Sequence, residues 1–103
     1  MSDLPSQFSW YDALVLYALL NAGPEGTNLA GIASFHDYVD HSRPSDEELR
    51  SRLQRLEAAG HVLASGPRYR ASANVWTECR AGILGPGSAG DAVEFVHQFL
   101  EGA

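Results

Sequence analysis

The sequence predicts a small, mainly α-helical domain that contains one β-hairpin. Three stretches before residue 60 each combine a helix-start signal with an apolar face. Two short runs of strand-forming residues follow, and an amphipathic stretch lies near the end of the chain. The expected order is therefore three helices, a two-stranded hairpin and a C-terminal helix.

The first helix is predicted to begin after Ser9 and to run to about Asn21. Ser9-x-x-Asp12 has the form of a capping box with the shorter acid, and Gly23-Pro24 is a helix-breaking pair. Residues 13–20 are apolar on almost every side. Such a helix must be covered by the rest of the fold, by a partner subunit, or by both.

The second helix is expected from about Asn28 to Asp40, with Thr27 as its N-cap. One side of this helix is expected to be its buried face, with Leu29, Ile32, Ala33, His36 and Val39. Residues 41–44 form a short connection, and Pro44 disfavours a helical conformation for Arg43.

The third helix has the clearest signals. Ser45-x-x-Glu48 is a capping box, and Gly60 provides a left-handed stop. The buried stripe is formed by Leu49, Leu53 and Leu56. Residues 61–65 and 68–71 then predict two strands joined by the tight turn Gly66-Pro67.

The remaining segments are less regular. Residues 72–82 leave open a short helix capped by Asn74 that carries Val75, Trp76 and Cys79. Residues 82–90, with four glycines and a proline, predict a flexible linker. Residues 91–101 predict an amphipathic helix. We expect a single domain over 1–103, with its core at about 9–73.

Composition is typical of a soluble cytoplasmic protein. The chain has 103 residues, a usual size for one domain, and 45% of them are hydrophobic. One cysteine, Cys79, allows no internal disulfide, and no signal peptide is recognisable. The longest apolar run, residues 13–20, is too short to cross a bilayer, so we expect no membrane association.

Charge is distributed unevenly along an acidic chain. The net charge is −6, which disfavours contact with nucleic acid. Six of the seven basic residues, all arginines, nevertheless lie between Arg43 and Arg70. Residues 1–42 contain five acids and no basic residue. This asymmetry marks the middle of the chain as the part most suited to an anionic partner.

The element order and one local motif resemble the winged helix-turn-helix. Leu53-x-x-Leu56-x-x-x-Gly60-His-Val62, followed by a turn and Arg68-Tyr-Arg70, resembles the junction between recognition helix and wing in PadR- and MarR-type bacterial transcription regulators. The resemblance covers roughly residues 10–73, and the terminal helix is similar to their dimerisation helices. It implies a dimeric DNA-binding regulator whose third helix enters the major groove.

Carried onto this chain, the resemblance selects six candidate DNA-binding residues. On the third helix, Gln54 would read adenine and Arg55 guanine. Arg68 and Arg70 would contact phosphates from the wing. The full set is Arg50, Ser51, Gln54, Arg55, Arg68 and Arg70.

One departure from the resemblance favours an alternative function. The expected recognition helix begins with Asp46-Glu47-Glu48, and carboxylates are repelled by phosphates. These acids would also serve as helix caps, and Glu48 and Glu57 could pair with the arginines. The alternative is an acidic winged-helix module that binds protein and no DNA.

Other constellations give weaker signals, and we expect neither an enzyme nor a metal or other cofactor. His36, Asp37, Asp40 and His41 are spaced one helical turn apart in pairs, but the two pairs do not converge as zinc ligands must. We expect His36 to hydrogen-bond Asp40 instead. Cys79 has no histidine placed to activate it, so we expect a thiol that packs under Trp76.

Two groups of aromatic residues bear on partners. Phe8, Trp10 and Tyr11 could line a pocket between the first and last helices, although an ordinary aromatic core is the commoner arrangement. Phe95 and Phe99 on the last helix could close the core or pair with a second copy. Because the first helix is apolar all round, we expect a homodimer through the first and last helices.

Overall fold

The computed structural model describes residues 8–84 and 89–102. Within these residues the chain is mainly helical and contains one two-stranded antiparallel hairpin. The elements are α1 (Trp10–Ala22), α2 (Leu29–Asp40), α3 (Asp46–Ala58), β1 (Val62–Ser65), β2 (Arg68–Ala71), α4 (Ala73–Leu84) and α5 (Ala89–Gly102).

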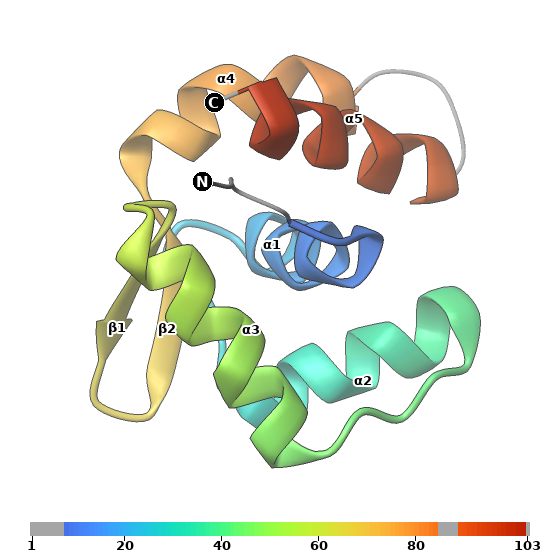
Figure 1. The fold of residues 1–103 in the computed structure, drawn as a ribbon, viewed down its shortest axis with the longest axis vertical. Coiled ribbons are helices and arrows are strands. Elements are labelled where there is room, and N and C mark those ends of the chain that lie inside the picture. The colour runs from blue at the N-terminus through green and yellow to red at the C-terminus, as the bar shows by residue number, and fades with distance from the viewer. Residues whose placement is uncertain (1–7, 85–88, 103) are drawn as a thin grey trace, which may run out of the picture.

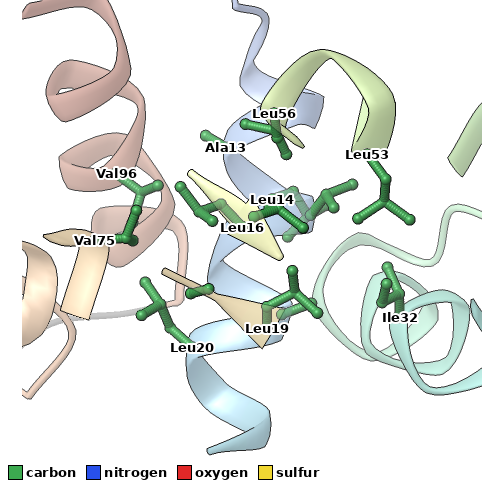
Figure 2. Packing of buried hydrophobic residues seen from close by; sticks show 14 of the residues in the cluster. Ala13, Leu14, Leu16, Leu19, Leu20, Ile32, Leu53, Leu56, Val75 and Val96 are labelled. Atoms are coloured by element: carbon green, nitrogen blue, oxygen red, sulfur yellow. The ribbon is translucent and has the colours of Figure 1, made fainter. Parts of the chain in front are cut away.

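Helix α1 lies in the middle of the molecule. Figure 1 shows α4 and α5 on one side of it, α2 and α3 on the other, and the hairpin at one end. Leu14, Leu16 and Leu19 are fully buried, in the same cluster as Val96 of α5 and Ile32 of α2 (Figure 2). The chain itself therefore covers the helix that the sequence marked as apolar on every side. Its burial no longer requires a partner subunit.

Both predicted capping boxes are confirmed. The Ser9 hydroxyl accepts a hydrogen bond from the backbone N–H of Asp12 at 3.2 Å, and the Ser45 hydroxyl accepts one from Glu48 at 3.1 Å. At the end of α3, Gly60 has a φ of +85°, and His61 N–H donates to the Leu56 carbonyl at 2.9 Å. This is the left-handed helix stop that the sequence predicted.

The predicted start of the second helix is wrong by one residue. Asn28 is the N-cap, because its side-chain Oδ1 accepts a hydrogen bond from Gly31 N–H at 3.0 Å. Thr27 instead exchanges two backbone hydrogen bonds with Tyr69 on β2, at 2.9 and 2.8 Å. Both residue types favour caps, and a long-range pairing invisible in the local sequence decided between them.

The two paired strands are confirmed. They run antiparallel, with Val62 opposite Ala71 and Ser65 opposite Arg68. The loop is the predicted Gly66-Pro67, and Gly66 has a φ of +62°, a conformation that a glycine adopts without steric cost.

The chain after the hairpin is more helical than predicted. Residues 72–82 were left open by the sequence, but α4 runs from Ala73 to Leu84, with Val75 and Cys79 buried one turn apart. The predicted linker at 82–90 is therefore wrong at both ends, because 82–84 belong to α4 and 89–90 to α5. Residues 85–88 lie outside the described residues. Glycine inside a helix costs only about 1 kcal/mol, which packing of α4 on α5 offsets.

The predicted C-terminal helix is present and begins two residues early, at Ala89. Ala92, Val93, Val96 and Leu100 form its buried side. None of the helices in the described residues is both long enough and apolar enough to span a membrane.

Candidate nucleic-acid interface

Three of the predicted DNA-binding residues lie together on the outer face of α3. Burial of Leu49, Leu53 and Leu56 turns the opposite side of the helix to solvent. Arg50, Ser51 and Gln54 are all exposed there. None of the three side chains makes a hydrogen bond or ion pair with another described residue. Their side chains are therefore available to a partner.

Arg55 has a different role in the structure. Its Nη2 donates a hydrogen bond to Oδ1 of Asp12 on α1, and Asp12 is fully buried. The Arg55 side chain is 53% exposed, and its guanidinium group reaches back to α1. Its assignment as a DNA contact stays a prediction, and its side-chain partner among the described residues is Asp12.

The two hairpin arginines project from the outward face of β2, whereas Ala71 is buried on the other face. Arg68 donates from Nη2 to the backbone carbonyl of Gly26 at 2.9 Å. The side chain of Arg70 is exposed and makes no hydrogen bond or ion pair with another described residue. They share a hollow of about 210 Å³ with the acidic residue Glu25.

The Thr27–Tyr69 pairing fixes the hairpin against the segment between α1 and α2. Gly26 has a φ of +72°, and a Cβ at this position would come within 1.8 Å of the Tyr69 carbonyl oxygen. Only glycine fits so close to a backbone carbonyl. The pairing therefore places Thr27 beside β2 as a single bridged residue. It also sets the position of the Gly26 carbonyl, which accepts the hydrogen bond from Arg68.

Arg50 faces the other side of the hairpin. It lines a hollow of about 220 Å³ together with Asn28 and Ala30 at the start of α2 and with Pro67 in the hairpin turn. Tyr69 lies between the two hollows, since it lines both. The structure thus brings Arg50 next to the start of α2 and the hairpin turn, and it leaves Arg68 and Arg70 in a separate hollow.

Carboxylates on α3 limit the positive character of this surface. Asp46, Glu47, Glu48 and Glu57 are all exposed. At about 100° per residue, Glu47 shares the outer face with Ser51 and Gln54. The hydrogen bond from the backbone N–H of Ser45 holds the pKa of Glu48 below its ordinary value, so this carboxylate is ionised at neutral pH.

The histidines and aspartates near the end of α2 do not converge on one point, because they bind different partners. His36 is buried, and its Nδ1 donates to the Ile32 carbonyl at 2.9 Å, in place of the bond to Asp40 that we expected. Asp40 accepts from Ser42 N–H at 3.0 Å, and Asp37 pairs with Arg43. In the part of the chain that the structure describes, no three His, Cys, Asp or Glu side chains are close enough to hold a metal ion.

The other predicted sites are buried to different extents. Cys79 is fully buried, and burial together with the Glu78 carboxylate raises the pKa of its thiol to about 11. Trp10 and Tyr11 contact each other edge to face at 5.4 Å, whereas Phe8 contacts His61. Phe99 also contacts His61, and Phe95 is 39% exposed on α5.

Several residues of this region were not singled out by the sequence as functional or structural anchors. The capping box indicated Asp12 as a helix cap but gave no sign of its pairing with Arg55. Tyr69 was noted only because it stands between two arginines, and its pairing with Thr27 leaves no local signal. Arg52 was not among the residues that the sequence selected. Its guanidinium carbon lies over the ring of Tyr11, 5.1 Å from the ring centroid.

Comparisons with protein-family models, curated protein sequences and solved structures found no significant match to this chain.

Proposed function

We propose that the chain is a winged helix-turn-helix module that binds DNA as a transcription regulator. In this assignment α2 and α3 are the helix-turn-helix and β1–β2 is the wing. The order of α1, the Thr27 pairing segment, α2, α3 and the hairpin supports it. The observation that carries the proposal is the group of exposed, unpaired side chains Arg50, Ser51 and Gln54 on α3.

Each proposed contact has a chemical role. Gln54 presents the amide donor and acceptor that match adenine in the major groove, and Ser51 is a short donor beside it. Arg50 lies next to the start of α2, where the helix dipole also favours a phosphate. Arg70 and the unbonded donors of Arg68 contact phosphates from the wing. Arg55 is left out because it is bound to Asp12.

The proposal makes a quantitative statement about salt. Three phosphate-contacting arginines per copy predict that log K falls with log salt with a slope of about −3 per bound copy. Because the chain is acidic, we expect weak binding to random sequence and a need for specific base contacts.

Fluorescence anisotropy with a duplex selected from a random pool tests the proposal. We expect Arg70→Ala to weaken binding to all duplexes and to reduce the salt slope by about 1. Gln54→Ala should instead reduce discrimination at one base pair by about 1–3 kcal/mol. Gln98→Ala, an exposed glutamine on α5, is the matched control. The absence of any binding at low salt would refute the proposal.

A homodimer is part of this proposal, with α5 as the contact. Because α1 is covered by its own chain, α5 has to provide most of the surface, and Phe95 is its large exposed apolar side chain. Sedimentation velocity of the wild type and of Phe95→Glu tests this arrangement. A wild type that is monomeric at high concentration would remove the dimer from the proposal.

A second function is favoured by the carboxylates on α3. Asp46, Glu47, Glu48 and Glu57 are exposed on the helix that would face DNA. A winged-helix module that presents α3 to a basic protein surface would use the same shape with the opposite charge preference. Retained folding with no DNA binding at any salt concentration, in the wild type and after Glu47→Gln, would favour this second function.

A further inference from the structure

A separate polar pocket lies where the start of α1, the connection between α2 and α3, and α3 itself meet. Its volume is about 320 Å³, at the lower end of the range of about 300–1,000 Å³ that is usual for small-molecule sites. Six residues line it: Tyr11, Ser42, Arg43, Pro44, Glu48 and Arg52. None of them belongs to the proposed DNA contacts.

Two buried polar atoms of the lining residues have no hydrogen-bond partner within the described residues. They are Nη1 of Arg52 and the hydroxyl oxygen of Ser42, which lies beside the Asp40 carboxylate without hydrogen-bond geometry. Buried polar groups in native proteins are nearly always paired, because leaving one unpaired is costly. Both atoms carry a hydrogen to donate. A ligand that fits this pocket should therefore carry hydrogen-bond acceptors.

Two arginines line the pocket, and their guanidinium groups are donors for an anion. Arg52 lies over the Tyr11 ring, and Arg43 is 85% exposed, with its Nε 3.5 Å from Asp37. The one lining carboxylate, Glu48, is already used, because its Oε1 accepts from Ser45 N–H at 2.9 Å. The carboxylates of Asp37 and Asp40 lie beside Arg43 and Ser42, and each already has a partner there. The two guanidinium groups that line the pocket match the oxygen atoms of an oxyanion.

We propose that this pocket binds a small oxyanion, either a phosphate or a carboxylate. Arg52 Nη1 and the Ser42 hydroxyl donate to its oxygens from inside the pocket, and Arg43 donates from the solvent side. Tyr11 forms the wall beneath Arg52. The site depends on the connection between α2 and α3 and is independent of the proposed DNA binding.

Titration of the full chain with sodium phosphate, and separately with sodium acetate, tests the proposal by NMR. Sodium chloride keeps the ionic strength constant. We expect saturable shifts at the backbone amides of Ser42 and Arg43 and at the Arg52 side chain. Arg43→Gln should weaken binding at least about tenfold, since a hydrogen bond to a charged group is lost. Arg70→Gln removes the same charge outside the pocket and should leave the affinity unchanged.

Ser42→Ala provides a second variant that keeps both guanidinium groups. We expect it to weaken binding several-fold while circular dichroism shows an unchanged fold. A stronger response to phosphate or to acetate supports the proposal and identifies which oxyanion fits. Shifts that grow linearly without saturation would overturn it. So would equal affinities of Arg43→Gln and Arg70→Gln, or shifts centred on Arg50 and Arg70.

Discussion

Arg55 on α3 binds the buried carboxylate of Asp12 on α1, and the two residues lie 43 positions apart in the chain. Asp12 is fully buried, whereas the Arg55 side chain is 53% exposed. The other carboxylate oxygen accepts hydrogen bonds from the backbone N–H and the hydroxyl of Ser9, at 2.8 and 3.2 Å. The Asp12 carboxylate therefore takes part in the N-terminal cap of α1 and also holds α3 against α1 through Arg55.

We expect Arg55→Ala to destabilise the protein by about 2–3 kcal/mol, because it leaves a buried carboxylate without its cation. Because the Arg55 side chain is half exposed, we expect a smaller loss of unfolding free energy than for a fully buried ion pair. Arg50→Ala, on the same helix without an internal partner, should change the free energy of unfolding by less than about 0.5 kcal/mol. Urea denaturation measures both. Equal effects of the two substitutions would show that the pairing contributes little.

Gly26→Ala should be more destabilising than Gly66→Ala, although both glycines have a positive φ. At Gly66 nothing lies within 4 Å of an added Cβ, so we expect only the backbone cost of about 1 kcal/mol. At Gly26 the Cβ would collide with the Tyr69 carbonyl and separate Thr27 from β2. We expect an additional loss of at least about 1 kcal/mol. Hydrogen exchange of the Thr27 and Tyr69 amides should become faster only in Gly26→Ala, and unchanged protection there would contradict this account.

The features predicted correctly from sequence are those whose physical cause lies within a few residues. The capping boxes at Ser9 and Ser45, the leucine stripe of α3 and the stop at Gly60 depend on local hydrogen bonds and on spacing along one helix. Local chemistry was sufficient for each of them.

The features missed depend on contacts between distant parts of the chain. Thr27 was taken for a helix cap, because nothing near it in sequence indicates its pairing with Tyr69. Arg55 was named only as a DNA contact that the resemblance implies, because nothing near it in sequence indicates its pairing with Asp12. The length of α4 was underestimated because packing on α5 overrides the low helix propensity of Gly82.

Cys79 should be almost inert in the folded protein. The thiol is fully buried, and its pKa is raised to about 11, first by burial and then by the charge of Glu78. Because the thiolate is the reactive form, we expect labelling by a disulfide reagent at neutral pH to be at least about a thousandfold slower than in denaturant. An exposed thiol introduced by Ser51→Cys into a Cys79→Ser background is the control, and it should react at the denatured rate. Rapid labelling of native Cys79 would mean that this part of α4 opens easily.

Two buried histidines should make the protein less stable in mild acid. Desolvation by burial lowers the pKa of both His36 and His61 from the ordinary value of 6.5. For His36, the nearby Arg52 charge acts in the same direction, while the hydrogen bond to Ile32 and the Asp40 charge oppose it. His61 is enclosed by Phe8 and Phe99, whose ring centroids lie 5.9 and 5.4 Å away. The folded state thus favours both rings in the neutral form.

The direction of the pH effect follows from where protons bind first. As the pH falls below 6.5, the unfolded chain takes up protons on these histidines before the folded chain does, so the free energy of unfolding falls until the folded-state pKa is reached. The lowered pKa values of Asp40 and Glu48 act only further down, below their ordinary values of 3.8 and 4.5.

Between about pH 6.5 and 5 we therefore expect each histidine to contribute a slope of up to about 1.4 kcal/mol per pH unit. Urea denaturation across this interval should give a shallower slope for His36→Gln than for the wild type. Slopes are compared because the substitution also changes the absolute stability. A wild-type stability that stays constant over this interval would mean that both rings accept a proton without leaving the core.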